Sequence, residues 1–325
     1  MLARRRPVIG LIAGMLAGGA VFAQPAGKVA RIGLLGNLNA KLNAKSVDAL
    51  REGLRELGWA EGRNLTIEYR WADGDLSRHV RLAEELVGQA VDVIVTAGPQ
   101  AVRAAMRATR TIPIVVAIMP DPVALGFAES LPRPGGNVTG LANFFEELTP
   151  KQVQIFKEAL PKAVRLAMLS DAEMAPLVQS AAEDAARSLG MDAKVYLVTD
   201  AAGIDAAIDD ARREHADGVQ VLPSPFFNRY RGRIAERTAR IGLPTISEAR
   251  EYVLDGGLMS YGPSFPRMYY RAASYVDRIL KGSRPGDLPI ERPTRFELVL
   301  NLKTARVLGL QIPRTLLLRA DEIVE

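Results

Sequence analysis

Short apolar runs alternate with amphipathic segments along almost the whole chain after residue 29. The clearest example is residues 92–106, DVIVTAGPQAVRAAM, where an apolar run passes through Gly98 and Pro99 into an alanine-rich segment. A continuous β-branched run is typical of a strand buried on both faces of a parallel sheet, and proline suits the first position of a helix. The alternation therefore predicts an α/β fold with parallel sheets.

The alternation forms two consecutive series of similar length. The first series contains predicted strands at residues 30–36, 64–71, 91–98, 112–118 and 136–143, with helices at 46–58, 76–89, from Pro99 onward and at 123–131. The second contains a helix at 147–161, strands at 164–171, 193–199, 217–224 and 243–248, and helices at 175–190, 203–215 and 229–242. Each series predicts one doubly wound parallel-sheet lobe.

The last segments, at 256–262, 264–282 and 295–310, are too few for a third domain and must return to the first two lobes. Two lobes that share several chain crossings form a hinge around a cleft. We predict a first lobe of residues 29–141 plus 253–290 and a second of residues 142–252 plus 291–325. The crossings are expected near residues 141–144, 249–252 and 289–294.

The N-terminus predicts export. Residues 1–23 contain three arginines, then an apolar run rich in glycine and alanine, and they end in a small residue, Ala23. This pattern indicates a signal peptide cleaved after Ala23. The alternative is a membrane anchor, for which the run of residues 7–23 lies at the lower limit of about 17 residues. Because the chain contains no cysteine, it has no lipid attachment site, and we expect a free periplasmic protein.

Loss of residues 1–23 removes three arginines and no acidic residue, which lowers the formal net charge from +5 to +2. No basic run remains that is typical of a nucleic-acid-binding surface.

Catalytic signals are weak in this chain. It has two histidines, His79 and His215, and both are expected in solvated helical positions. No cluster has the spacing of a metal site, and there is no P-loop, nucleophile elbow or dinucleotide-binding turn. We therefore predict neither a cofactor nor a metal.

Ligands of open α/β sheets bind beyond the carboxyl ends of the strands. The residues at Ala97, Gly98, Pro99 and Gln100 predict a helix start that can bind a carboxylate or phosphate through backbone N–H groups. The other candidates are polar side chains at strand ends: Asn37, Thr96, Asp121, Asn143, Ser170, Asp171, Ser224, Glu248 and Tyr261. Of these, Glu248 or Asp171 could pair with a ligand ammonium, whereas Asp121 is also placed to cap a helix.

Two long segments carry a family resemblance: residues 112–140, IPIVVAIMPDPVALGFAESLPRPGGNVTG, and the C-terminal block of residues 256–325. They resemble the ABC transporter substrate-binding proteins of the tryptophan/tyrosine type, and the likeness covers residues 29–325. The resemblance implies the type I periplasmic-binding fold, with three crossings and a cleft that closes on a solute. It also implies a membrane permease with a cytoplasmic ATPase as the partner.

The chain departs from this family at the predicted cleft. It has Ala97-Gly98-Pro99 where relatives often have Gly-Thr-Pro, Pro120 where they tend to have a hydroxyl residue, and Leu169-Ser170-Asp171 at a strand end. The ligand class is therefore left open between amino acids and aromatic or organic acids.

The resulting prediction is a monomeric periplasmic protein that binds a small carboxylate-bearing solute and has no enzymatic activity. Two alternatives remain open from the sequence: a periplasmic sensory module that passes its ligand state to a receptor, and an exported two-domain α/β enzyme.

Overall fold

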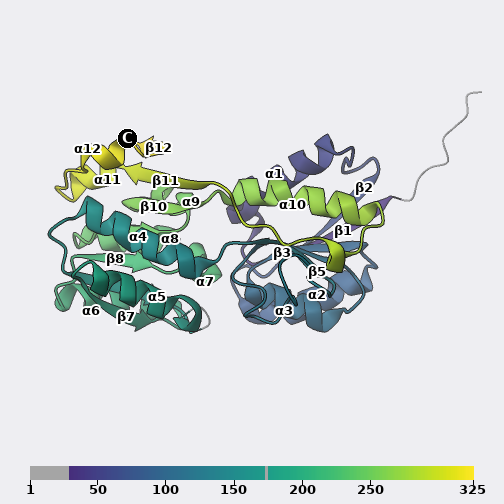
Figure 1. The fold of residues 1–325 in the computed structure, drawn as a ribbon, viewed down its shortest axis with the longest axis horizontal. Coiled ribbons are helices and arrows are strands. Elements are labelled where there is room, and N and C mark those ends of the chain that lie inside the picture. Colours follow the sequence, from purple (N-terminus) through teal and green to yellow (C-terminus); the bar gives the residue numbers. More distant parts are fainter. Residues whose placement is uncertain (1–28, 173–174) are drawn as a thin grey trace, which may run out of the picture.

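The structure is a computed structural model that describes residues 29–172 and 175–325, so the predicted signal peptide lies outside the described residues. Two sheets, each covered by helices, form two α/β lobes that lie side by side along the long axis of the molecule (Figure 1). We call the lobe with the five-stranded sheet the first lobe and the lobe with the seven-stranded sheet the second lobe. The predicted architecture is confirmed. None of the described helices combines the length and the apolar character needed to cross a membrane.

The sheet of the first lobe is entirely parallel, in the order β2-β1-β3-β4-β5. Its strands are β1 (Ala30–Gly36), β2 (Leu65–Trp71), β3 (Val93–Ala97), β4 (Ile114–Met119) and β5 (Val138–Ala142). Its helical elements are α1 (Ala40–Glu56), η1 (Leu76–Arg78), α2 (His79–Gly88), α3 (Pro99–Ala108), α10 (Phe265–Leu280) and η2 (Pro285–Asp287). The apolar faces of α1 and α10 cover one side of the sheet, and α2 and α3 cover the other. Every residue of β3 is buried, as its β-branched run predicts.

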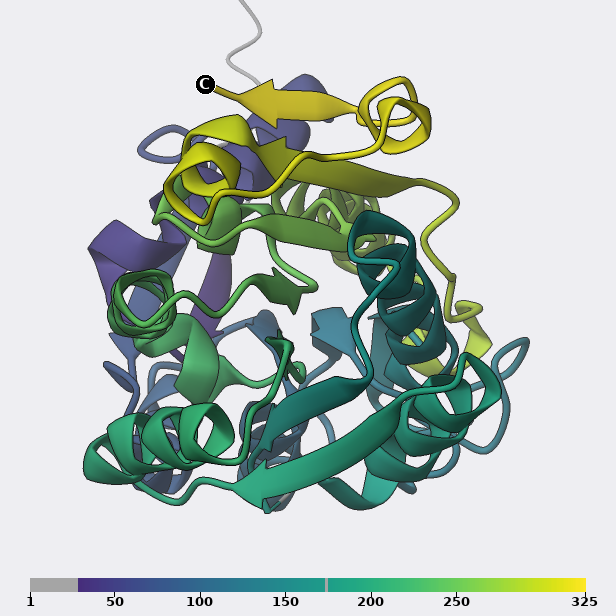
Figure 2. The same cartoon turned by 90° about the vertical axis from the view of Figure 1, so that its left-hand side faces the viewer.

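The sheet of the second lobe has the order β12-β11-β10-β9-β8-β6-β7. Its strands are β6 (Arg165–Ser170), β7 (Asp192–Leu197), β8 (Gly218–Val221), β9 (Thr245–Ser247), β10 (Met259–Pro263), β11 (Phe296–Asn301) and β12 (Glu322–Val324). Its helices are α4 (Phe145–Ala159), α5 (Ala175–Ser188), α6 (Ala201–Arg213), α7 (Pro225–Arg229), α8 (Arg231–Arg240), α9 (Arg250–Leu254), α11 (Leu302–Val307) and α12 (Arg314–Leu317). Viewed from the end of this lobe, helices lie on both sides of the sheet and the C-terminal segment forms one margin (Figure 2).

One strand pair in the second lobe departs from the predicted parallel order. β10 and β11 are antiparallel, with Met259 opposite Leu300 and Pro263 opposite Phe296. The chain leaves β10 for α10 in the first lobe and then returns through the hinge. β11 therefore starts at the end of the sheet where β10 stops, and it runs in the opposite direction.

Three segments connect the lobes. The chain passes from β5 to α4 at residues 143–144, from β10 to α10 at residue 264, and from η2 to β11 at residues 288–295. The crossing expected near residues 249–252 is therefore wrong, because α9 and β10 continue the second lobe. Residues 253–263 belong to the second sheet, where β10 pairs with β9 and β11.

The helix expected at residues 123–131 is also absent. Pro122 begins a single turn, which ends at Gly126 with φ +71°. The carboxylate of Asp121 accepts hydrogen bonds from the backbone N–H groups of Val123 and Ala124, at 2.8 and 3.2 Å. Asp121 therefore caps this turn, which is the structural role that the sequence left open for it.

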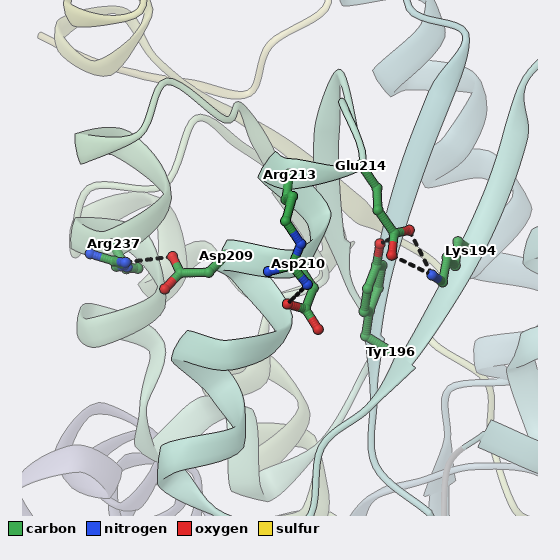
Figure 3. A network of polar contacts seen from close by, with 7 residues as sticks. All are labelled: Lys194, Tyr196, Asp209, Asp210, Arg213, Glu214 and Arg237. Atoms are coloured by element: carbon green, nitrogen blue, oxygen red, sulfur yellow. Dashed lines mark hydrogen bonds and ion pairs between the residues drawn. The ribbon is translucent and has the colours of Figure 1, made fainter.

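β7 is one of the two edge strands of the second sheet, and it carries polar side chains. Lys194 Nζ donates to both carboxylate oxygens of Glu214, at 2.7 and 2.6 Å, and the hydroxyl of Tyr196 donates to the same carboxylate (Figure 3). The hydrogen bonds from Lys194 and Tyr196 lower the pKa of Glu214. Charged side chains on an edge strand disfavour pairing with another chain, which is a structural role for this network.

Candidate functional site

The joint between β3 and α3 has the geometry that the sequence predicts. Gly98 has φ +79° and ψ 151°, a conformation that is essentially restricted to glycine, and Pro99 follows at the start of the helix. The backbone N–H of Gly98 donates to the carbonyl oxygen of Ile118 at 2.7 Å, and proline has no N–H. The donors that an anion would meet here are therefore the N–H groups of Gln100 and Ala101, which have no acceptor four residues earlier in the helix.

A cavity lies between the two lobes at this joint. It offers about 100 Å³ to the centres of water-sized molecules. From the first lobe it is lined by Asn37, Leu38, Asn43, Ser46, Ala97, Gly98, Pro99, Ile118, Met119, Pro120, Phe265 and Tyr269. From the second lobe it is lined by Phe145, Pro223, Ser224, Pro225, Asn228 and Glu248. We call this the interlobe cavity. Most of its wall is apolar or aromatic, with a few polar groups, which is the usual composition of a small-molecule site.

Asn37 links the end of β1 to the end of β3. Its Nδ2 donates to the carbonyl oxygen of Ala97 at 2.8 Å, which fixes the amide beside the glycine joint. Its Oδ1 is buried and has no hydrogen-bond partner among the described residues. An unpaired buried acceptor is unfavourable, so this atom is available to a ligand donor.

Glu248 is the only carboxyl side chain that lines the interlobe cavity within the described part of the chain. It follows β9 and is 5% exposed. Desolvation raises the pKa of its carboxyl group to about 7. Apart from its own backbone N–H, its hydrogen-bond donor is Asn228 Nδ2, at a long 3.5 Å. A cationic group in the cavity would stabilise the ionised form.

Ser224 reaches the cavity, but its hydroxyl group is already engaged. It donates to the carboxylate of Asp171 and accepts from the backbone N–H of Phe226 at 3.1 Å, so it caps α7. Asp171 is held outside the cavity lining by this bond.

Several predicted site residues are not brought to the cavity. Thr96 is buried and donates to the carbonyl oxygen of Leu35 at 2.8 Å. Ser170 is buried and donates to the carbonyl oxygen of Asp171 at 3.2 Å. Both hydroxyl groups therefore support the strand ends. The side chain of Gln100 does not line the cavity, and its Oε1 is buried without a partner among the described residues.

Asn143 and Tyr261 lie at a second cavity beside the hinge. This cavity of about 300 Å³ is also lined by Phe144 and Arg292, and it shares no residue with the interlobe cavity. The ring of Tyr261 stacks on Phe296 at a centroid distance of 5.8 Å. The carboxyl ends of the strands therefore lead to two different cavities.

The two histidines do not supply catalytic groups to the cavity. His79 is 1% exposed, so its predicted solvated position is wrong, and burial lowers its pKa. Its Nδ1 lies 2.9 Å from the carbonyl oxygen of Leu76. Across residues 29–172 and 175–325, no group of three or more histidine, aspartate or glutamate side chains could hold a metal ion.

Sequence reasoning missed the residues that helices bring to the cavity. These are Asn43 and Ser46 on α1, Asn228 on α7, and Phe265 and Tyr269 on α10. A weak signal was present, since Asn43 and Ser46 are three residues apart and share one face of a helix. Phe145 on α4 also lines the cavity, whereas Phe227 on α7 is buried in the core of the second lobe.

The sequence and the fold are similar to those of known proteins. Residues 35–324 match the family model described as ABC transporter substrate binding protein. The chain is 24% identical over 278 residues to a tyrosine-binding protein of Clostridioides difficile (strain R20291), which covers 82% of this chain and 78% of the relative.

Two solved structures share the fold. A conserved domain protein from Vibrio cholerae O1 biovar El Tor is 26% identical, with a TM-score of 0.86, and covers 91% of this chain and 100% of its own. An ABC domain in complex with L-Trp from Streptococcus pneumonia is 22% identical, with a TM-score of 0.84, and the match covers 91% of this chain and 99% of that domain. The family consists of binding proteins, not enzymes. The family match spans most of the sequence, and this chain belongs to the ABC transporter substrate-binding protein family.

Proposed function

We propose that this protein captures a small carboxylate-bearing solute in the interlobe cavity and delivers it to the permease of an ABC importer. The favoured solute class is an amino acid, with aromatic or organic acids as the alternative. The protein would act as a monomer in the periplasm after removal of residues 1–23. Solute binding for an ABC transporter follows from the family; the cavity, the solute class and the location are our proposals.

The observation that carries the solute class is the pair of opposite electrostatic features on one cavity. The N-terminus of α3 offers the positive end of a helix dipole at Gly98 and Pro99, and Glu248 offers a buried carboxyl group. A molecule with a carboxylate and an ammonium satisfies both features at once. Capture would move Glu248 to its ionised form, since the ammonium replaces the water lost on burial.

The apolar wall favours a solute with an apolar or aromatic side chain. Phe145, Phe265 and Tyr269 come from both lobes and line the same cavity. Aromatic rings provide large contact areas and prefer offset or edge-to-face packing against another ring. The names of two relatives refer to tyrosine and L-Trp, which supports a test with aromatic amino acids first.

In this proposal the N–H groups of Gln100 and Ala101 bind the solute carboxylate. The Oδ1 atom of Asn37 and the carboxylate of Glu248 accept hydrogen bonds from the solute ammonium. Asn43, Ser46 and Asn228 add neutral hydrogen-bonding groups from α1 and α7.

The experiment is thermal unfolding of the protein without residues 1–23, with and without a panel of amino acids, aromatic acids, organic acids and sugars. A true ligand at a hundred times its dissociation constant stabilises the folded state by about 2.7 kcal/mol, a shift of a few degrees. For each hit, the matched amide and the matched deaminated acid are measured by calorimetry. We expect both to bind at least about tenfold more weakly, because each leaves one end of the site unpaired. If the amide binds as tightly as the parent ligand, the start of α3 does not bind the solute carboxylate.

A variant separates the two ends of the site. Glu248→Gln should weaken binding of an amino acid but leave binding of the deaminated acid nearly unchanged. If Glu248→Gln weakens both ligands equally, Glu248 does not contact the ammonium. Delivery is tested by solute uptake in cells with and without the protein, and a receptor response without uptake would favour the sensory alternative.

A further inference from the structure

The short helix α7 of the second lobe touches the first lobe at both of its ends. It lies on the side of the second lobe that faces the first lobe (Figure 1). Its first residue, Pro225, approaches Gly98, and its last residue, Arg229, approaches Gly74. Between them, Asn228 lines the interlobe cavity and donates to Glu248. The same five-residue helix therefore contacts both the cavity and the opposite lobe.

The contact at Gly74 lies outside the interlobe cavity and is very close. A Cβ atom added to Gly74 would overlap Cδ of Arg229 and lie only 2.5 Å from its Nη1. The side chain of Arg229 therefore lies directly against Gly74, and a side chain at position 74 would require Arg229 to move. Neither residue lines the interlobe cavity.

The turn that receives Arg229 is rigid and acidic. Asp73 and Gly74 have φ +55° and +74°, and the N–H of Gly74 donates to the carbonyl oxygen of Asn37 at 2.7 Å. The next residue, Asp75, accepts hydrogen bonds from Ser77, which lower the pKa of its carboxyl group, and the nearby positive charges of Arg78 and Arg229 lower it further. The guanidinium group thus meets a fixed peptide surface flanked by carboxylates.

This turn is coupled to the ligand site through Asn37. The backbone of Asn37 holds Gly74, and its side chain holds Ala97 beside the glycine joint. At the other end of α7, a Cβ added to Gly98 would lie 3.1 Å from Asn37 Nδ2 and 3.4 Å from Pro225. Asn37 therefore connects both glycine positions that α7 approaches.

We infer that α7 is a clasp between the lobes and that Arg229 is a positioning residue for solute capture. Its side chain docks on the Gly74 turn when the lobes close, and this contact stabilises the closed state without touching the solute. The inference rests on the proposed capture by lobe closure. It predicts that the affinity for the solute depends on a residue outside the cavity, because a ligand that binds the closed form is weakened as that form becomes less populated.

The first test is the affinity of Arg229→Ala for the solute identified above. We expect affinity to fall about tenfold, chiefly through faster dissociation, since lost closing contacts act mainly on the rate of release. The matched control is Arg213→Ala, which removes the same charge from the same lobe. Arg213 pairs with Asp210 on α6 (Figure 3), and α6 lies on the side of the second lobe that is remote from the first lobe (Figure 1). Wild-type affinity in Arg229→Ala, or an equal loss in Arg213→Ala, would overturn the inference.

The second test is a double-mutant cycle with Gly74→Ala. The added methyl group collides with Arg229 only when the lobes are closed, so Gly74→Ala should also weaken binding. Removal of Arg229 relieves that collision, and the double variant should bind at least as well as Gly74→Ala alone. If the affinity losses of Arg229→Ala and Gly74→Ala simply add in the double variant, the two residues are not in direct contact. If Gly74→Ala does not fold, Gly74→Asn introduces the same Cβ with a residue that tolerates positive φ.

The third test needs no solute and therefore separates the clasp from the proposed function. The chain has no cysteine, so labels can be attached specifically at Asp48→Cys and Glu236→Cys, whose side chains are 71% and 70% exposed in the first and second lobe. We expect Arg229→Ala to reduce the population with short interlobe distances in the ligand-free protein. Identical distance distributions with and without Arg229 would refute the clasp. A changed distribution together with no ligand in the whole panel would leave the clasp intact and refute the proposed function.

Discussion

At the scale of single residues, Glu248 sets a pH dependence of stability. Its carboxyl group has a pKa of about 7 in the folded protein, raised by burial from its usual 4.5. A raised acid pKa stabilises the fold below about pH 4.5 and loses that contribution as the pH rises through 7. We predict that the free energy of unfolding of the ligand-free protein falls, relative to Glu248→Gln, by about 3 kcal/mol between about pH 4 and about pH 8.

Urea unfolding of both proteins across this pH range measures the difference, and the comparison cancels the titration of all other groups. Parallel curves for the two proteins would mean that Glu248 is solvated in the ligand-free state. In that case the lobes would be open at rest and the carboxyl group would become buried on closure.

Gly98 is a second residue whose effect can be predicted. Its φ of +79° and ψ of 151° disfavour any side chain, and an added Cβ would press on Asn37 and Pro225. We expect Gly98→Ala to lower the free energy of unfolding by about 2 kcal/mol and to weaken solute binding. The matched control is Gly88→Ala at the end of α2, where an added Cβ meets no atom within 4 Å. Chemical unfolding should show this control within about 0.5 kcal/mol of wild type. Equal effects of the two substitutions would refute the backbone argument.

At the scale of elements, the start of α1 links stability to the ligand site. Asn39 caps this helix, and its Oδ1 accepts the N–H of Leu42 at 3.0 Å. The first turns of the same helix present Asn43 and Ser46 to the interlobe cavity. We expect Asn39→Ala to lower the free energy of unfolding by about 1 kcal/mol and also to reduce solute affinity.

The control for the cap is Asp200→Ala. Asp200 caps α6 through the N–H of Gly203 at 2.8 Å, and neither residue lines the interlobe cavity. Asp200→Ala should lower the free energy of unfolding, measured by chemical unfolding, by about as much as Asn39→Ala. Its solute affinity, measured by calorimetry, should stay at the wild-type value. If both variants bind alike, the orientation of the first turns of α1 does not control the site.

The elements that were predictable are those with a strong local pattern. The β-branched run at Val93 to Val95 and the Gly98-Pro99 pair are sufficient to predict β3, its turn and the start of α3. The start of α1 at Ala40 was missed because residues 40–45 show no apolar periodicity, and the cap from Asn39 decides it. The predicted helix at 123–131 failed because one capped turn and Gly126 satisfy that segment without further helix.

The candidate site was predictable only where strand ends supply it. The rule that ligands bind beyond the carboxyl ends of strands found Asn37, Gly98, Ser224 and Glu248. It did not find the residues that α1, α7 and α10 contribute, because their orientation depends on how the two lobes meet. It also grouped Asn143 and Tyr261 with the interlobe cavity, although they line a different cavity.

At the scale of the molecule, the lobe boundary is set by α10. This helix follows β10 in the chain, but its buried face packs on the first lobe, with Tyr269, Ala272 and Val276 in the same core as Leu50 and Leu54 of α1. β10 itself pairs within the second sheet. We therefore place the start of the returning part of the first lobe at residue 264 and not at residue 253.

This boundary can be tested with the first lobe alone. We predict that residues 29–143, joined by a flexible glycine-serine linker to residues 264–291, fold and unfold cooperatively. Residues 29–143 without α10 should not fold cooperatively, because the apolar face of α1 and one face of the sheet would be exposed to water. The matched control joins residues 29–143 to residues 253–291 and so carries β10 without its partners β9 and β11. We expect this control to be no more stable than the chain with residues 264–291 and to associate more readily. Thermal unfolding followed by circular dichroism, with size-exclusion chromatography, distinguishes the three chains. Cooperative unfolding of residues 29–143 alone, or higher stability of the chain with β10, would show that α10 does not define the lobe.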